Sequence, residues 1–388
     1  MDVVEHGGPD GPASATPAWL RVLDGSPPAG PFAHPAWAST WCSVYGRFHP
    51  PLVLELRDGG RPVAILPLQQ TTYPGLRTKR LEFIGGSAMT RREWLLNPRH
   101  PGQAIYSDLV VTPGFEQQAL DALRSWLTDR AGVWDELRLT CVPATGAFAR
   151  GFPALAERWS PRVVVSEKVY IDTRPGWPAY RGRLGKRQQR HLRYEPNTLA
   201  RKAGADLELV VHRGEDVPER VDELSDLFAR RWAARDRGMP AGNRVLYRRL
   251  ACARELHPAV YSLVAGGRPV AMQFGFDDGR RYLPYVFAFD PFLDHTSPAN
   301  VLIAFAIRRC CEDGHAEVDL AALDAVDRWA GDPRPRADLV ATSPRALGRA
   351  RAAGLDLTAR SIAALHESRA GRRVVRGLGR ARLKAAGR

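Results

Sequence analysis

The sequence repeats a short segment of itself, and this repeat constrains the fold more than any other feature. Residues 49–68 read HPPLVLELRDGGRPVAILPL, and residues 257–276 read HPAVYSLVAGGRPVAMQFGF. The six residues GGRPVA occur in both copies, each time between two strand-like runs of apolar residues. A Gly-Gly pair between such runs is typical of a two-residue hairpin turn. The repeat therefore predicts that one structural unit with a β-hairpin occurs twice in the chain.

The second copy continues into a pattern that predicts a crossover between parallel strands. Residues 281–290 are rich in aromatic residues and predict a strand, and residues 316–320 predict another. Between them, Ser297 and Pro298 are a typical N-cap and first residue of a helix. The first half offers a similar series, with strands at 81–84 and 136–140 and a helix at 115–129. Both halves therefore predict mixed α/β layers of sheet and helix.

The length of 388 residues allows two or three domains. Residues 1–30 are rich in Gly, Pro and Ala, which predicts a disordered N-terminal tail. We expect four segments: this tail, an N-terminal half (31–165), a C-terminal half (166–342) and a basic helical C-terminal tail (343–388).

The net charge of +14 is concentrated in two segments. Residues 180–202 contribute +7 and residues 369–388 contribute +8, so the remainder of the chain is close to neutral. A polyanionic partner would meet these segments. The five cysteines are scattered and form no C-x-x-C pair, which argues against a disulfide framework and a zinc site. No apolar run reaches the ~18 residues of a membrane span, and no secretory signal is evident, so we expect a cytoplasmic protein.

A series of motifs along the chain gives it a resemblance to a known group. The motifs are His34-Pro35 with Trp41, Ile65–Leu68, Phe83–Gly86, Tyr106 with Asp108, the basic run Lys186–Arg193, Arg231-Trp232, Gly267–Ala271, Ala288–Asp290 and Ser297–Leu302. In this order they resemble CelD-type acetyltransferases of cellulose and exopolysaccharide synthesis, members of the GNAT superfamily related to the FemABX aminoacyl transferases. The resemblance runs from about residue 34 to about residue 330. It implies tandem GNAT-like domains, each a mixed, mostly antiparallel sheet flanked by helices.

The resemblance implies an acyltransferase that moves an acyl group from acetyl-CoA or another acyl-CoA to an amine or hydroxyl of a sugar or small metabolite. The residues expected to bind the coenzyme are Thr296, Ser297, Ala299, Asn300 and Val301. A helix start suits a pyrophosphate, because its N–H groups lack internal partners and carry partial positive charge. The alternative is an ordinary capped helix that enters the core. The sequence departs from the family pattern by having Ala299 in place of a glycine, Asp327-Arg328 in place of a Tyr-Lys pair, and no GNAT pyrophosphate signature.

Two carboxylates and a tyrosine are the candidates for catalysis. Asp319 and Asp324 follow the last predicted strand, where either could act as the base, directly or through water. Tyr285 is the candidate acid for the leaving thiolate. The alternatives are two solvated loop acids and a core tyrosine. The residues expected to contact the acceptor are Tyr106, Asp108, Arg231, Trp232 and Gln273, although a structural tyrosine and a packed tryptophan fit equally well.

Two other functions remain open from the sequence. The donor could be an aminoacyl-tRNA, as in FemABX-like ligases, bound through residues 180–202 and 369–388. The fold could also be a degenerate acyltransferase kept as a binding module. Neither alternative, nor the acyl-CoA reaction itself, requires a metal ion.

Overall fold

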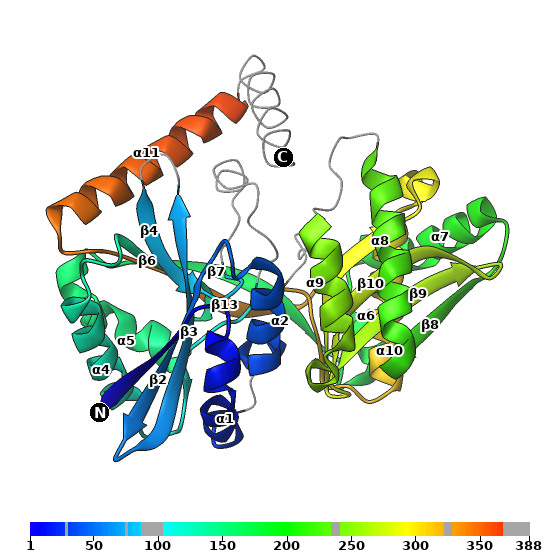
Figure 1. Cartoon of the computed structure of the whole chain (residues 1–388). Coiled ribbons are helices and arrows are strands. Elements are labelled where there is room, and N and C mark those ends of the chain that lie inside the picture. Colours follow the sequence, from blue (N-terminus) through cyan, green and yellow to red (C-terminus); the bar gives the residue numbers. More distant parts are fainter. Residues whose placement is uncertain (28–29, 74–76, 87–103, 234–240, 322–327, 368–388) are drawn as a thin grey trace. The chain divides into compact units, whose positions relative to one another are not determined.

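The computed structural model divides the chain into two compact units (Figure 1). Unit 1 comprises residues 1–166 and 336–388, and unit 2 comprises residues 167–335. The structure describes residues 1–27, 30–73, 77–86, 104–233, 241–321 and 328–367.

Unit 1 is built on a mixed sheet. Its strands are β1 (Asp2–Gly7), β2 (Pro51–Asp58), β3 (Arg61–Tyr73), β4 (Thr78–Phe83), β5 (Val110–Val111), β6 (Glu136–Pro143) and β13 (Asp332–Thr342). The spatial order is β1-β2-β3-β4-β6-β13, with β5 beside the first part of β3. Neighbouring strands are antiparallel except β4 and β6, which pair in parallel at Arg80–Glu136 and Leu81–Leu137. This sheet is therefore mostly antiparallel, with one parallel crossover.

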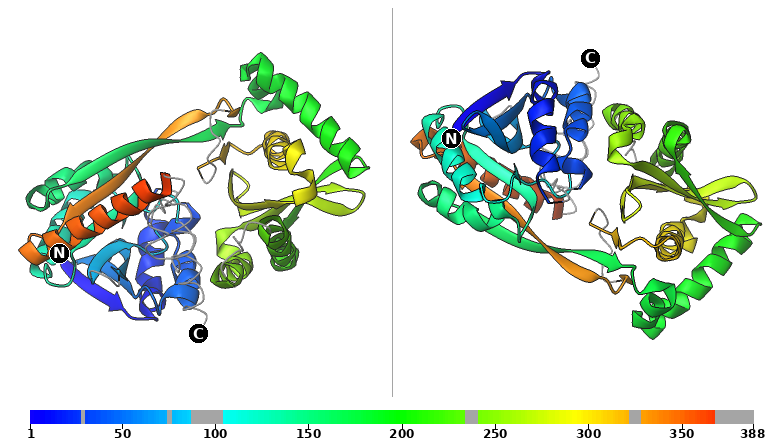
Figure 2. Two further views of the ribbon diagram at one scale, coloured as in Figure 1. Left: turned by 90° about the horizontal axis from the view of Figure 1, so that it is seen from above. Right: turned by 90° about the horizontal axis from the view of Figure 1, so that it is seen from below.

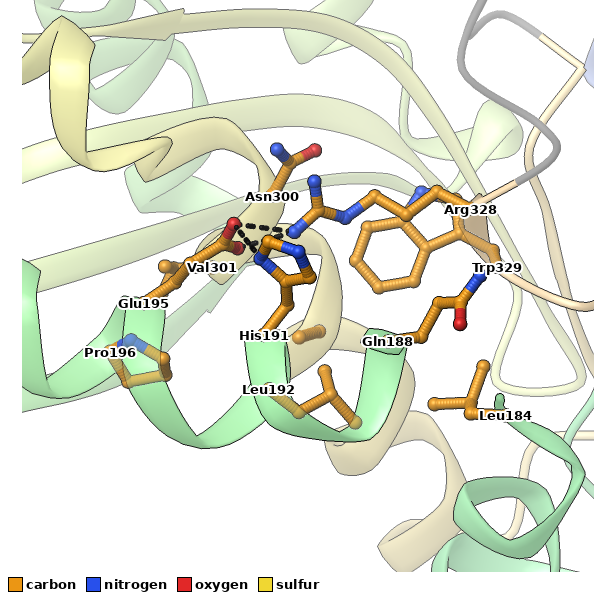
Figure 3. Close-up of a pocket in the computed structure, with 11 residues that line it drawn as sticks. Leu184, Gln188, His191, Leu192, Glu195, Pro196, Asn300, Val301, Arg328 and Trp329 are labelled. Atoms are coloured by element: carbon orange, nitrogen blue, oxygen red, sulfur yellow. Dashed lines mark hydrogen bonds and ion pairs between the residues drawn. The ribbon is translucent and has the colours of Figure 1, made fainter. Parts of the chain in front are cut away.

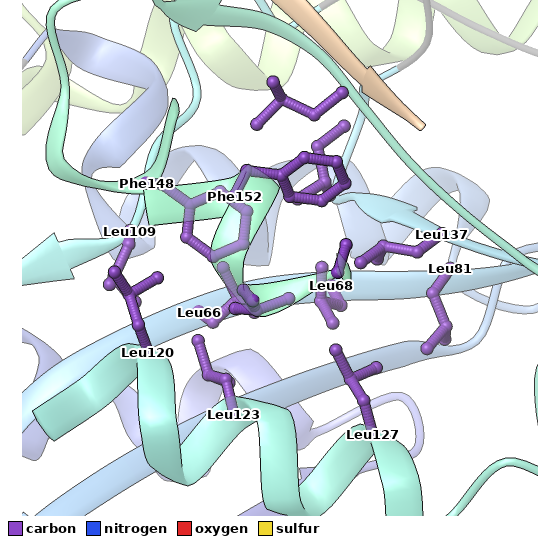
Figure 4. Packing of buried hydrophobic residues seen from close by; sticks show 14 of the residues in the cluster. Leu66, Leu68, Leu81, Leu109, Leu120, Leu123, Leu127, Leu137, Phe148 and Phe152 are labelled. Carbon is purple, nitrogen blue, oxygen red and sulfur yellow. The ribbon is translucent and has the colours of Figure 1, made fainter. Parts of the chain in front are cut away.

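Helices cover both faces of the sheet in unit 1. They are α1 (Gly11–Asp24), α2 (Pro35–Tyr45), α4 (Glu116–Asp129), α5 (Ala147–Leu155) and α11 (Ala346–Glu367). Figure 4 shows the core between α4, α5 and the sheet, where Leu120, Leu123 and Leu127 of α4 face leucines of β3, β4 and β6. Their spacing of three and four residues places these leucines on one helix face, which is why α4 packs there.

Unit 2 contains a second sheet with the same plan. Its strands are β7 (Arg162–Asp172), β8 (Leu207–Arg213), β9 (Pro258–Ala265), β10 (Arg268–Asp277), β11 (Arg281–Phe289) and β12 (Glu317–Asp319). The spatial order is β8-β9-β10-β11-β12-β7. Only β11 and β12 pair in parallel. The order and the single parallel pair match those of unit 1.

The helices of unit 2 lie on both faces of its sheet. They are α6 (Gly176–Arg183), α7 (Lys186–Ala203), α8 (Val217–Ala233), α9 (Ala241–Cys252) and α10 (Pro298–Glu312). Figure 2 shows α8 and α9 on one face and α10 on the other, with α7 beside α10. The apolar residues of α10 form a core with Tyr261, Ala271 and Tyr282 of the sheet.

The predicted duplication is present in the structure. The repeated GGRPVA segments join β2 to β3 and β9 to β10, and the first strand of each hairpin has eight residues. Gly59 and Gly60 have φ values of 53° and 81°, and Gly266 and Gly267 have 54° and 75°. Two successive left-handed residues are what the tight hairpin turn of a twisted sheet requires. The helix directly before β2 is α2 and the helix directly before β9 is α9, so these two helices correspond to each other.

Two expectations about the chain's organisation are wrong. The N-terminal residues form β1 and α1 rather than a disordered tail, and Trp19 of α1 is fully buried with its Nε1 donating to Ala33 O at 2.9 Å. The C-terminal half also does not extend to residue 342, because β13 pairs with β6 and supplies the last strand of unit 1. The corresponding strand of unit 2 is β7, which precedes that unit's helices. The expected helical tail contains α11, and residues 368–388 lie outside the described residues.

A buried polar cluster fixes the end of α10 to the sheet. Asp277 at the end of β10 receives hydrogen bonds from the Tyr261 hydroxyl (2.8 Å) and the Gly279 N–H (3.0 Å), and its carboxylate lies 2.7 Å from His315 Nε2. Burial opposes ionisation of Asp277, but these contacts together hold its pKa well below the usual range. The cluster thereby sets the position of α10, whose other end begins the candidate site.

No helix in the described ranges is long and apolar enough to span a membrane. Within the same ranges, His, Cys, Asp and Glu side chains form no group of three that could hold a metal ion.

Candidate functional site

The predicted helix start at Ser297 has an unusual backbone. Ser297 occupies the N-cap position with a φ of 57°, and its side chain makes no capping hydrogen bond. Its carbonyl instead accepts the N–H groups of Asn300 (2.9 Å) and Val301 (3.2 Å). Pro298 has no N–H, so in this first turn the Ala299 N–H remains without an acceptor among the described residues. The buried Thr296 hydroxyl donates to Leu293 O at 2.6 Å. The turn can therefore offer one backbone donor and the positive end of the helix dipole to an anion.

β11 and β12, the strands before and after α10 in the sequence, diverge beside the start of this helix. β11 and β12 pair only at Arg281–Glu317 and Tyr282–Val318, and the later residues of β11 have no partner in β12. The register between β10 and β11 shifts at Tyr285, which is the extra residue of a β-bulge. A bulge and two diverging strands interrupt the regular pairing of backbone groups. In open α/β sheets, ligands bind outside the carboxyl ends of such strands.

A narrow crevice lies between α7 and the first turns of α10 (Figure 3). It is lined by Leu184, Gln188, His191, Leu192, Glu195, Pro196, Asn300, Val301, Ala304, Arg328 and Trp329. Its volume of 10 Å³ is about that of a single water site. Within it, the Glu195 carboxylate receives both bonds of Arg328 Nη2 (2.5 and 2.6 Å) and lies 2.9 Å from His191 Nδ1. Arg328 therefore neutralises the acid that lines this crevice.

The residues at the start of α10 include several groups that attract a phosphate group and one that repels it. The helix dipole, the Ala299 N–H and the side-chain amide of Asn300 can all favour an anion. The Glu195 charge opposes an anion but is paired. The turn provides fewer free backbone donors than an ordinary helix start, because Pro298 has no N–H and the Ser297 carbonyl accepts the Asn300 N–H.

Asp319 lies at the end of β12 and is completely buried. Its carboxylate accepts the Ala321 N–H at 3.0 Å and pairs with Arg334 Nη1 at 2.5 Å, and Arg334 also pairs with Glu317 at 2.6 Å. Burial raises the pKa of Asp319 to about 6, although Arg334 favours the ionised form. Asp319 can thus exchange a proton near neutral pH. Asp324 lies outside the described residues.

Tyr285 and Gln273 both contact neighbouring residues within the sheet of unit 2. The ring of Tyr285 packs against Tyr247, Phe274 and Phe276, with centroids 5.7 to 6.5 Å apart. Gln273 is buried, and its Oε1 accepts the Tyr282 hydroxyl at 3.1 Å. Both residues therefore have packing roles in the sheet, which any contact with a substrate would have to accommodate.

Arg231 reaches the end of β11 from α8. Its guanidinium lies 3.8 Å from the centre of the Phe289 ring and 5.5 Å from that of Phe287. The structure thus brings Arg231 to the strand that leads into α10. Trp232 is the next residue of α8, and its side chain lies outside the described part of the structure.

Tyr106 and Asp108 belong to unit 1, in the segment before β5. Tyr106 is buried and has a φ of 69°. Asp108 accepts the Leu109 N–H at 2.8 Å, and burial raises its pKa to about 7. The other predicted site residues described above all lie in unit 2.

His191, Glu195, Arg328 and Arg334 were not predicted from the sequence as residues near the site. Glu195 and Arg328 are 133 positions apart, and ordinary charged residues carry no signal of such a pairing. One feature of the sequence did single out Arg328, because it occupies the place of the Tyr-Lys pair in the family that the sequence resembles.

Residues 186–330 match the family model described as an acetyltransferase (GNAT) domain. No curated protein matches the sequence. Among solved structures, the chain is similar to the C-terminal domain of a putative lysylphosphatidylglycerol synthetase from Agrobacterium fabrum, with a TM-score of 0.53 and 12% identity over 89% of this chain and 96% of that one. It is also similar to a conserved protein of unknown function from Bacteroides thetaiotaomicron, with a TM-score of 0.50 and 12% identity over 85% of this chain and 97% of that one.

A tandem GNAT protein from the clavulanic acid biosynthesis pathway has a TM-score of 0.45 and 15% identity over 89% of this chain and 99% of that one. The chain itself consists of two α/β units with the same strand order, and its residues 186–330 match a GNAT acetyltransferase domain.

Proposed function

We propose that the protein is a cytoplasmic acyltransferase that uses acetyl-CoA or another acyl-CoA as donor. The observation that carries this proposal is the start of α10 beside the diverging strands β11 and β12, within the segment that matches the GNAT domain. The coenzyme pyrophosphate would bind at this helix start, against Ala299 and Asn300. Thr296, Ser297 and Val301 would shape the turn around it.

The transfer needs little covalent chemistry from the protein. The acceptor amine or hydroxyl attacks the thioester carbonyl, a base accepts the acceptor's proton, and the coenzyme leaves as a thiolate that takes up a proton. Asp319 is the described carboxylate suited to be the base, acting through water because its own oxygens are buried. Tyr285 remains the candidate acid for the thiolate. The resemblance to CelD-type proteins favours a sugar or small metabolite as acceptor.

Release of coenzyme A thiol tests this function. The purified chain is incubated with acetyl-CoA and longer acyl-CoA esters, each with amino sugars, sugars and amines, and the free thiol is measured with a chromogenic disulfide. We expect acceptor-dependent thiol release with at least one pair. Acceptor-independent release alone, or none with any donor, would contradict the proposal.

One observation favours a second donor, an aminoacyl-tRNA. Exposed basic residues gather on α6 and α7, and no ion pair joins them to any described residue; they are Arg181, Lys186, Arg187, Arg190, Arg193, Arg201 and Lys202. Lys186, Arg190 and Arg193 are spaced by four and three residues and share one helix face. Such a row can contact successive phosphates. The fold neighbour named as a lysylphosphatidylglycerol synthetase is also consistent with aminoacyl transfer.

Salt-dependent RNA binding separates the two donors. Fluorescence anisotropy would follow labelled tRNA with the native chain and with the double variant Arg190→Gln, Arg193→Gln. A tRNA donor predicts a steep fall of affinity with salt, whose logarithmic slope decreases by about 0.7 to 0.9 for each phosphate contact removed. The matched control is Arg61→Gln, Arg268→Gln, which removes two exposed charges from the twin turns. Equal binding by both double variants would exclude α7 as the tRNA surface, as would the absence of tRNA binding by the native chain. Residues 369–388 lie outside the described residues and stay a predicted contact.

A further inference from the structure

Arg336 is a deeply buried cation in unit 1. It lies on β13 opposite Pro143 of β6, and only 2% of its surface is exposed. Its Cζ lies 3.0 Å from the centre of the Tyr106 ring. Its Nε has no hydrogen-bond acceptor, and no carboxylate among the described residues pairs with it. Burying a charge without an opposite charge is costly, so this arrangement requires an explanation.

Unit 1 contains a second buried arginine, Arg80, which differs from Arg336 in being paired with a carboxylate. Arg80 is also 2% exposed, and its guanidinium lies 4.7 Å from the centre of the Tyr73 ring. Unlike Arg336, its Nε donates to Glu136 at 3.0 Å and its Nη1 donates to the Tyr73 hydroxyl at 2.7 Å. Both arginines thus have an aromatic neighbour, but within the described ranges a carboxylate pairs with Arg80 and none with Arg336.

The acids two residues after Arg336 and two residues after Tyr106 have other partners. Asp338, two residues further on in β13, accepts the Cys141 N–H at 2.9 Å. Asp108, two residues after Tyr106, accepts the Leu109 N–H, and burial raises its pKa to about 7. Burial lowers the pKa of Arg336 to about 9, so the guanidinium stays charged at neutral pH. Among the residues that the structure describes, the charge of Arg336 is therefore not compensated.

We propose that Arg336 binds the carboxylate of a small-molecule ligand in unit 1, with the Tyr106 ring packed against the guanidinium. The two oxygens of a carboxylate match the forked donors of arginine, and its single charge balances the single charge of Arg336. A phosphate dianion would leave an excess charge in the same buried place. This inference goes beyond the proposed acyl transfer, because every residue that it uses lies in unit 1.

A comparison of the stability of two matched variants of the full chain tests whether the buried charge of Arg336 is unpaired. Thermal unfolding without added ligand would compare Arg336→Met and Arg80→Met, which replace each arginine with an apolar chain. We expect Arg336→Met to raise the Tm, because it removes a buried charge that has no partner. We expect Arg80→Met to lower the Tm, because the buried Glu136 loses one of its two arginine partners and keeps only Arg138. A similar loss of Tm in both variants would overturn the proposal.

Titration with simple anions tests the ligand. The probes are sodium acetate, benzoate and glutamate, compared with phosphate and sulfate at constant ionic strength. A carboxylate should raise the Tm of the native chain, since a ligand that binds only the folded state stabilises it. Its Kd should increase about 10- to 100-fold in Arg336→Met. Arg336→Lys retains the charge and should keep part of the affinity. Equal shifts with phosphate or sulfate, or no shift with any carboxylate, would contradict a carboxylate site.

Discussion

At the scale of single residues, Asp319 is a buried carboxylate whose pKa is raised toward neutral pH. An aspartate normally has a pKa near 3.8, and burial raises that of Asp319 to about 6 despite its ion pair with Arg334. A base must be deprotonated to act. If Asp319 is the base, the acyltransfer rate should rise as the pH increases through about 6 and level off above it.

The variant Asp319→Asn tests this role. We expect kcat to fall by about 10²- to 10⁴-fold, the usual contribution of a general base, and the rise near pH 6 to disappear. The measurement is the pH profile of thiol release with the best acceptor. Asp332→Asn is the matched control, because Asp332 also pairs with an arginine of unit 2 (Arg183, 2.8 Å) but is partly exposed. A profile in Asp319→Asn that keeps the same inflection would show that another group is the base.

The sequence identified some residues near the site but not their partners. Asn300, Val301 and Arg231 could be found because they lie within or beside recognisable motifs. Glu195 and Arg328 could not, because their pairing depends on where α7 lies against α10. Contacts between residues distant in sequence leave no local pattern, and this limit applies to most charged pairs around the site.

At the scale of elements, the twin hairpins predict equal responses in the two units. Gly60 and Gly267 have φ values of 81° and 75°, and a Cβ on either would meet no other atom within 4 Å. The backbone conformation alone therefore disfavours alanine. Gly60→Ala and Gly267→Ala should each lower the free energy of unfolding by about 1 kcal/mol, measured by urea denaturation.

Gly182→Ala is the control for the glycine series. Gly182 lies in α6 with ordinary helical backbone and equally open surroundings. Alanine should raise the free energy of unfolding there by about 0.5 to 1 kcal/mol, the reverse of its effect in the turns. A stabilising effect at either hairpin would contradict the left-handed turns.

Most elements with a clear apolar period were predictable from the sequence. The expected helix at 115–129 corresponds to α4, and the strand at 281–290 corresponds to β11. α1 was missed because its Pro, Gly and Ala content is typical of a tail. Its buried residues Ala15, Trp19 and Val22 nevertheless follow a helical spacing, and contact with the rest of unit 1 stabilises it.

At the scale of the whole molecule, the order of strands in space differs from their order in the chain. Most of β13 follows unit 2 in sequence, yet Ala337, Leu339 and Ala341 belong to the core of unit 1. The sequence predicted the duplication but not this exchange of the last strand, because a short apolar strand does not specify which sheet it joins.

The variant Leu339→Ala tests the assignment of β13. Leu339 is fully buried, so its loss should lower stability by about 2 to 5 kcal/mol. Hydrogen exchange should show weaker protection in α4 and β6 of unit 1 and little change in β9 and β10. Leu357→Ala in α11, where the side chain is 67% exposed, should have little effect. Weaker protection confined to unit 2 would show that β13 belongs to the sheet of unit 2, which would contradict its assignment to unit 1.

The central claim is that unit 2 binds a coenzyme thioester at the start of α10, and calorimetric titration of the full chain with acetyl-CoA and longer acyl-CoA esters tests it most directly. The variant Asn300→Asp adds a negative charge beside the proposed pyrophosphate, while an acid in the first turn favours the helix itself. We therefore expect binding by the native chain, at least tenfold weaker binding by Asn300→Asp without loss of Tm, and unchanged binding by the control Gln118→Glu on the exposed face of α4. Equal affinity in Asn300→Asp and the native chain, or no binding of any acyl-CoA, would contradict the account.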